Sequence, residues 1–181
     1  MKLIILLCIF PIIVAKEQKE KRSLLSTNLQ DLKWVLLRKN ACFSGASDLP
    51  AIVPIWQDGF LVATKLVHVS GIIKCSGSAQ GSNFGCYDDH TKLNVFVCDD
   101  KRQVIFPSPS QVITYDGYKN YQYPGFMATD KEIIFSNFPY PVFVNNGEQI
   151  TIWNGEDLFN VADTDNSGRV CVDVYGLIGS S

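Results

Sequence analysis

The chain has 181 residues, of which 46% are hydrophobic and 19% charged, and its formal net charge at pH 7 is −2. This balance excludes a protein that holds nucleic acid through a broad basic surface, since such proteins neutralise phosphates with clustered Lys and Arg. It also excludes a highly acidic protein that binds many cations along its chain. The length is sufficient for one domain with a substantial hydrophobic core.

The first 15 residues have the pattern of a secretory signal peptide. Met1-Lys2 gives a positive start, Leu3–Val14 is an unbroken apolar run, and Ala15 supplies the small residue of a cleavage site. The apolar run is shorter than the roughly 20 residues that a membrane-spanning helix needs. We therefore expect a secreted, extracellular protein without a membrane span in its mature form.

Residues 16–22 are entirely polar and end in the dibasic pair Lys21-Arg22. Two interpretations stay open: a disordered N-terminus, or a short pro-segment that an endoprotease removes after Arg22. Removal of residues 1–22 would leave 11 basic and 16 acidic residues, a net charge of −5.

The segment 23–59 is expected to hold one helix followed by a linker. Within Ser26–Lys39, apolar residues recur at helical spacing, and Ser26, Thr27 or Asn28 can cap the N-terminus. The cations in the second half of this segment suit the negative end of a helix dipole.

From residue 60 the pattern changes to short runs rich in Val, Ile and aromatic residues, separated by turn residues. Strands are expected at Phe60–His68, Lys92–Cys98, Gln103–Phe106, Glu132–Phe135, Val142–Val144, Gln149–Trp153 and Val170–Tyr175.

The turn Asn146-Gly147 gives the strongest hairpin signal, because both residues accept the positive φ of a type I′ turn. It predicts that Val142–Val144 pairs with Gln149–Trp153. Seven short strands predict a mainly β domain over residues 60–178, an antiparallel sandwich or jelly-roll-like fold preceded by the N-terminal helix.

Five cysteines remain once Cys8 leaves with the signal peptide, which predicts two disulfides and one leftover thiol. The best pair is Cys75 with Cys86, because a bridge there would close a Gly/Ser-rich loop and contribute roughly 2–3 kcal/mol. Cys42, Cys98 and Cys171 compete for the second bridge. The leftover cysteine is expected to be buried or to pair with another chain.

One loop resembles the start of a calcium-binding loop. Asp163, Asp165 and Ser167 place oxygen-bearing side chains at alternate positions, and Gly168 follows where the chain turns sharply. These three residues are our candidate metal ligands, and calcium is the only cofactor that the sequence suggests.

The calcium pattern has departures. Val174 stands where such a loop carries a bidentate Glu, and the flanking segments are expected to be strands instead of helices. Glu156 or Asp157 could complete the ligand shell. A polar hairpin loop without a metal explains the same residues.

A run of tyrosines offers a second candidate site, at Tyr115, Tyr118, Tyr121 and Tyr123. Exposed aromatic rings on a loop can stack on sugars or form a protein-binding hot spot. The alternative is structural, because Tyr often buries its ring and leaves its hydroxyl in water.

No catalytic residues are predicted. His68 lies in an apolar strand and His90 in a charged turn, and none of the common hydrolase, metalloprotease or phosphate-binding motifs occurs. We therefore expect a protein that is not an enzyme.

Three parts of the sequence carry a resemblance to a known group: Thr64–Cys75 with Ser82–Cys86, then Ile150–Leu158, then Asp165–Tyr175. Together they resemble a secreted domain of corals, sea anemones and their relatives, which also occurs in skeletal organic-matrix proteins. The most specific part is the ending W-x-G-E-D-L … D-N-x-G-x-x-C-V-D-V-Y. The resemblance implies a β-rich extracellular module with no assigned catalytic residues.

These observations favour a noncatalytic component of an extracellular matrix, with matrix or mineral-associated proteins as partners. Two alternatives remain: a secreted venom or defence effector, and a lectin that binds carbohydrate through Tyr118 and Tyr121.

Overall fold

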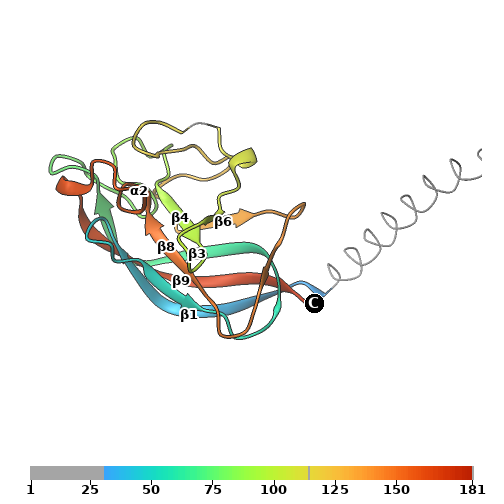
Figure 1. The fold of residues 1–181 in the computed structure, drawn as a ribbon. Helices are drawn as coiled ribbons and strands as arrows, with labels where there is room; N and C mark the ends of the chain where they lie inside the picture. The colour runs from blue at the N-terminus through green and yellow to red at the C-terminus, as the bar shows by residue number, and fades with distance from the viewer. Residues whose placement is uncertain (1–30, 114, 181) are drawn as a thin grey trace, which may run out of the picture.

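The computed structural model describes residues 31–113 and 115–180 (Figure 1). The expected signal peptide, the segment 16–22 and the first part of the expected helix lie outside these residues. The described chain is mainly antiparallel β structure arranged in two sheets. In this part of the chain, none of the helices has the length and hydropathy needed to cross a bilayer.

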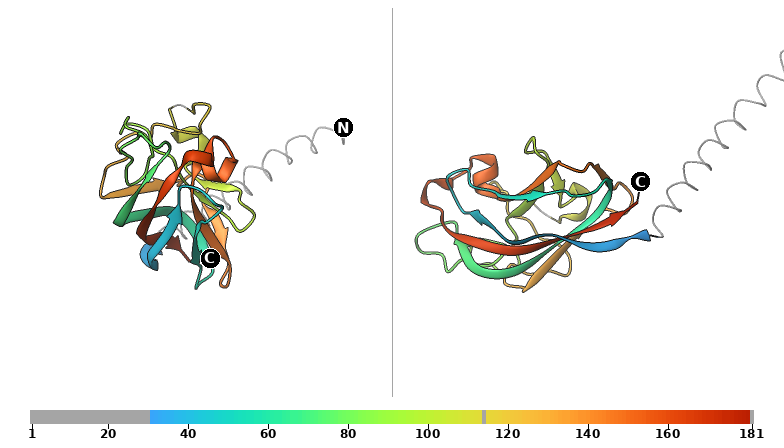
Figure 2. Two further views of the ribbon diagram at one scale, coloured as in Figure 1. Left: turned by 90° about the vertical axis from the view of Figure 1, so that its left-hand side faces the viewer. Right: turned by 90° about the horizontal axis from the view of Figure 1, so that it is seen from below.

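The larger sheet has the strand order β1-β9-β3-β6, and β7 pairs with the first residues of β3. Figure 2 shows its three long strands running side by side along one face of the molecule. The strands are β1 (Lys33–Ser44), β3 (Gly59–Lys74), β6 (Glu132–Ser136), β7 (Val142–Val144) and β9 (Ser167–Gly179).

The smaller sheet has the order β2-β8-β4-β5 and lies across from the long strands (Figure 1). Its strands are β2 (Ala51–Pro54), β4 (Val95–Cys98), β5 (Val104–Phe106) and β8 (Gln149–Asn154). The helical turns are the 3-10 helices η2 (Pro109–Gln111) and η3 (Asp163–Asp165), and the α-helix α2 (Gly155–Phe159).

Both sheets bury their inner faces in one hydrophobic core. In β9 the buried residues are Val170, Val172 and Val174, the alternation that a strand with one face on the core produces. They share the core with Ile150 and Ile152 of β8 in the opposite sheet. Burial of each such side chain stabilises the fold by about 1.5–3 kcal/mol, so this shared core holds the two sheets together.

The expected helix was wrong over its described part, because residues 33–44 form strand β1. Its buried residues Leu37 and Ala41 are four positions apart, which resembles helical spacing. The cause is an irregularity: the pairing with β9 shifts register on both sides of Arg38, and Asn40 has a φ of 49°. A bulge of this kind inserts an unpaired residue and breaks the two-residue period.

The segment expected to be a linker also contributes a strand. In β2, Ala51 and Val53 are buried, and the strand pairs with β8 from Ala51↔Ile152 to Pro54↔Gln149. The residues before position 60 therefore supply one strand to each sheet.

The predicted hairpin was wrong, although both of its strands exist. β7 pairs with β3 in the larger sheet, whereas β8 pairs with β2 and β4 in the smaller one. In the turn between them, Glu148 N donates to Asn145 O (3.1 Å) and Gly147 is the residue with positive φ, 91°. One positive φ at this position gives a type II turn, and a type I′ hairpin turn needs two. The turn carries the chain from one sheet to the other.

Two disulfides are present. Cys75–Cys86 closes the loop after β3, the pair that the sequence favoured, and Cys42–Cys171 joins directly paired residues of β1 and β9. Of the described cysteines, Cys98 is free and fully buried, and burial raises the pKa of its thiol to about 12. Cys98 is therefore the buried leftover cysteine, one of the two alternatives that the sequence left open.

The two disulfides should differ in their contribution to stability. Cys42 and Cys171 are 129 residues apart and Cys75 and Cys86 are 11 apart, so the chain-entropy model gives about 5 and about 3 kcal/mol. We expect the double variant Cys42→Ser/Cys171→Ser to lose about 2 kcal/mol more than Cys75→Ser/Cys86→Ser in denaturant unfolding. An equal or reversed order would contradict this account.

Candidate functional site

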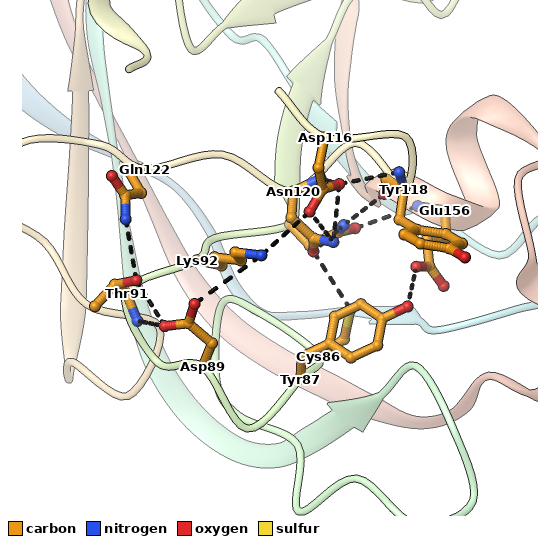
Figure 3. A network of polar contacts seen from close by, with 11 residues as sticks. Cys86, Tyr87, Asp89, Thr91, Lys92, Asp116, Tyr118, Asn120, Gln122 and Glu156 are labelled. Atoms are coloured by element: carbon orange, nitrogen blue, oxygen red, sulfur yellow. Dashed lines mark hydrogen bonds and ion pairs between the residues drawn. The ribbon is translucent and has the colours of Figure 1, made fainter. Parts of the chain in front are cut away.

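A depression of about 580 Å³ lies between the loop 115–120 and the segment that precedes β4 (Figure 3). Its wall carries charged side chains and two tyrosine rings whose centroids are 6.3 Å apart. The lining residues are Tyr87, Asp88, Asp89, Lys92, Asp116, Gly117, Tyr118 and Asn120.

Asp116 holds the loop on one side of the depression. Its Oδ1 accepts hydrogen bonds from the backbone N of Tyr118 (2.9 Å) and of Asn120 (3.0 Å), and from Asn120 Nδ2 (3.2 Å). Asp commonly organises turns in this way, by accepting from backbone N–H groups that follow it. The result is a fixed loop that leaves the Tyr118 ring 50% exposed.

Lys92 links the two sides of the depression. Its Nζ lies 3.4 Å from Asp116 Oδ2 and 4.0 Å from Asp89 Oδ2. Asp89 also accepts from Thr91 Oγ1 (2.6 Å) and Thr91 N (3.1 Å), and these bonds lower its pKa. Both ion pairs are partly exposed and therefore weak, which leaves these groups available to a ligand.

Asn94 connects the loop 115–120 to the start of α2 through hydrogen bonds of its side chain. It is buried, and its Oδ1 accepts from Gly155 N (2.6 Å) and Glu156 N (3.2 Å). Its Nδ2 donates to Tyr118 O (3.1 Å) and Asn120 Oδ1 (2.7 Å). All four bonds come from one side chain, so the exposed loop and the start of α2 are positioned together. Sequence analysis missed Asn94, because nothing local marks a buried amide.

The sequence W-N-G-E-D is explained by the packing at this point. Trp153 is buried, with the Arg102 guanidinium 4.5 Å from its ring centroid, and Asn154 caps α2 by accepting from Asp157 N (3.4 Å). Gly155 is required by space: a Cβ there would lie 2.5 Å from the Phe96 ring and 2.7 Å from Asn94 Oδ1.

The next two residues are buried carboxylates. Glu156 and Asp157 are 0% and 1% exposed, and burial raises the pKa of both, that of Glu156 to about 7. Glu156 Oε1 accepts from Tyr87 Oη (2.9 Å) and Asp157 Oδ1 from Asp48 N (3.1 Å).

The second oxygen of each buried carboxylate, Glu156 Oε2 and Asp157 Oδ2, makes no hydrogen bond of normal geometry, although the nearby Asn166 side chain lowers the pKa of Glu156 and so partly offsets the effect of burial. Within residues 31–113 and 115–180, no Lys, Arg or His forms an ion pair with either group. Buried carboxylate oxygens without partners are costly, so this position would be stabilised by a proton or a cation.

The expected calcium loop lies next to these carboxylates. Asp163 and Asp165 form η3, and Ser167 begins β9. The negative charges of Asp163 and Asp165 act on the carboxyl groups of α2. Asp163 helps to raise the pKa of Asp157, and Asp165 helps to raise that of Glu156.

The loop does not close around a site by itself. In the described chain, Asp163 and Asp165 belong to no group of three ligand atoms from His, Cys, Asp or Glu within 4.8 Å of one another. The group that meets this distance consists of Cys75, Cys86 and Glu156, and its two cysteines are joined in a disulfide.

The four candidate tyrosines divide into two kinds. Tyr121 is 1% exposed and its hydroxyl donates to Val95 O; Tyr123 is buried against Phe126 and Phe135. Neither lines the depression around Tyr118: Tyr121 is a core residue, as the structural alternative proposed, and Tyr123 borders a separate depression together with Phe126. Tyr115 is exposed, but its ring stacks on Phe96 outside the depression. Of the four candidate tyrosines, Tyr118 is therefore the one that lines the depression.

The fold is shared with a solved lectin structure, AJLec from the sea anemone Anthopleura japonica. The two agree with a TM-score of 0.74 and 32% sequence identity, over 82% of this chain and 98% of AJLec. This chain belongs to the AJLec family. No protein-family model matches the sequence, and no curated protein is significantly similar to it.

Membership in the AJLec family supports part of the sequence interpretation. A sea anemone relative agrees with the expected cnidarian extracellular module, and a lectin is a noncatalytic protein. The link to skeletal matrix proteins is not shown by these comparisons.

The packing around Gly155 leads to a stability prediction. We expect Gly155→Ala to lower the free energy of unfolding by about 1–3 kcal/mol, because its Cβ would overpack Phe96 and Asn94. Gly77→Ala is the matched control, since a Cβ there meets nothing within 4 Å. Denaturant unfolding of both variants measures the difference, and equal stabilities would show that α2 tolerates displacement.

Proposed function

We propose that this protein is a secreted lectin whose sugar site is the depression around Tyr118. The observation that carries the proposal is an exposed tyrosine ring beside carboxylate and amide groups that are already fixed by hydrogen bonds. A sugar ring has an apolar C–H face, which the electron-rich face of an aromatic ring attracts. Its hydroxyls can donate to Asp116 and Asp89 and accept from Lys92 or Asn120.

The size and construction of the depression support this proposal. A volume of about 580 Å³ falls in the range of small-molecule sites. Asn94 and Asp116 hold the loop in place before a ligand arrives, so little ordering entropy is lost on binding. The AJLec relationship supports carbohydrate as the ligand class, and the signal-like N-terminus and two disulfides support secretion.

The matrix interpretation rests on the sequence resemblance alone. The lectin interpretation has both a solved relative and a preformed depression lined by carboxylates and tyrosine rings, so we prefer it. A lectin can also attach to the glycans of a matrix or act in defence, and these uses would share the same binding site.

Replacement of Tyr118 should test the sugar site directly. We expect Tyr118→Ala to weaken glycan binding by tenfold or more with no change in melting temperature, because the ring is half exposed and supplies a stacking surface. Binding is measured on a glycan array and then by calorimetry with the best ligand.

Tyr140→Ala is the matched control for this experiment, since Tyr140 is an exposed tyrosine that does not line the depression. Tyr121, which the sequence analysis paired with Tyr118, is unsuitable because it is buried. Unchanged binding by Tyr118→Ala, or an equal loss in Tyr140→Ala, would remove the depression as the sugar site.

We also propose that calcium binds beside α2, with Asp163, Asp165 and Ser167 as candidate ligands and Glu156 or Asp157 completing the shell. The support is the pair of unpartnered oxygens on two buried carboxylates, Oε2 of Glu156 and Oδ2 of Asp157. Calcium favours a set of six to eight oxygen ligands, which carboxylates supply. A bound cation would remove the cost of burying these groups.

Calcium should raise the melting temperature by about 5–10 °C at a concentration 100-fold above its dissociation constant, since such binding adds about 2.7 kcal/mol of stability. Asp163→Asn/Asp165→Asn should abolish most of this shift, whereas Asp100→Asn, at an exposed position elsewhere, should retain it. Thermal unfolding in calcium, magnesium and chelator provides the measurement. The absence of any calcium effect on the unchanged chain would refute this site.

A further inference from the structure

The charged groups around the depression are mostly acidic. Three carboxylates, those of Asp88, Asp89 and Asp116, line it together with one ammonium, that of Lys92. A fourth carboxyl group, that of Glu156, lies behind Tyr87 and accepts its hydroxyl hydrogen bond (Figure 3). A ligand that enters the depression therefore meets an excess of negative charge.

These carboxylates are held in position and cannot easily turn away from a ligand. Asp88 Oδ1 accepts from Gln80 N (2.6 Å), and Asp89 Oδ1 accepts from both the backbone and the hydroxyl of Thr91. Asp116 accepts from the loop that it organises. Because each is fixed by backbone N–H donors, the negative potential is a built feature of the site.

The nearby cations do not offset this excess. Lys92 offers one positive charge against the three carboxylates of the lining, so the excess of negative charge remains when its ammonium group is counted. The Lys119 ammonium lies over the Phe159 ring, 5.2 Å from its centroid, on the α2 side of the loop. No other Lys or Arg lines the depression among the residues that the structure describes.

We propose that the depression selects neutral or amino-bearing glycan ends and rejects ends that carry a carboxylate or sulfate. This selectivity rests on the proposed lectin function and defines its ligand class. Neutral hydroxyls donate hydrogen bonds to the fixed carboxylates, and an ammonium group adds a charge-assisted bond. A carboxylate or sulfate would be repelled by two or three charges at close range, and rejecting a competitor in this way is a common source of specificity.

Pairs of oligosaccharides that differ by one charged group test the proposal. The array should carry neutral oligosaccharides beside the same chains bearing one terminal sialic acid or one O-sulfate, and chitin oligosaccharides beside their deacetylated forms. At low salt we expect each acidic member to bind on the order of tenfold or more weakly than its neutral partner, and the difference to shrink as salt screens it. Deacetylated oligomers should bind at least as well as acetylated ones.

A charge-removing variant separates electrostatic rejection from steric exclusion. Asp89→Asn keeps the acceptor oxygen that Thr91 uses and removes one charge. The ratio of the affinities for the neutral and the acidic member of a pair should therefore fall about threefold. Asp100→Asn, which lies outside the depression, should leave this affinity ratio unchanged.

The outcomes for the lectin function and for its selectivity differ. Binding to no glycan at all would overturn the lectin function itself. Binding to neutral and acidic members alike, or preference for the acidic members, would leave the lectin function standing and overturn the selectivity. A preference for neutral members that Asp89→Asn does not alter would assign the selectivity to shape instead of charge, and would also overturn the proposal.

Discussion

The two-sided pairing of β9 is the constraint on which the rest of the structure depends. This strand pairs with β1 from Lys33↔Ile178 to Ser44↔Arg169 along one edge, and with β3 from Phe60↔Gly179 to Lys74↔Ser167 along the other. Its valines supply the centre of the core, and the Cys42–Cys171 bridge fixes its register with β1. Because β1 and β9 lie far apart in the sequence, the larger sheet is complete only when these two distant segments have paired.

The same strand places the candidate site. The chain enters β9 directly from η3 and reaches η3 from α2, so the acidic turn and the buried carboxylates lie at the beginning of β9. Asn94 then joins α2 to the loop that carries Tyr118. The exposed tyrosine is thus held by a continuous path of hydrogen bonds that begins in the core, which suits a binding surface that must be ordered before its ligand arrives.

The relation between sequence and structure differs from element to element. β9 was predictable because its valines recur at every second residue, which is the period of a strand. β1 was not, because its bulge around Arg38 and Asn40 moves Leu37 and Ala41 to a spacing of four, and local reading assigns that spacing to a helix. The hairpin at Gly147 failed for another reason: a turn residue shows that the chain reverses, but it does not show which strands become neighbours.

By itself the sequence determined the strand-rich character of the chain, the Cys75–Cys86 loop and the acidic turn at Asp163 and Asp165, because each is written in neighbouring residues. Only the tertiary structure decided that Tyr118 is exposed while Tyr121 and Tyr123 are buried, and that Glu156 and Asp157 lack partners for one oxygen each. It also brought Asp89, Lys92 and Asp116 together around one depression. Burial and proximity depend on contacts between residues far apart in the chain, and no local pattern of residues encodes them.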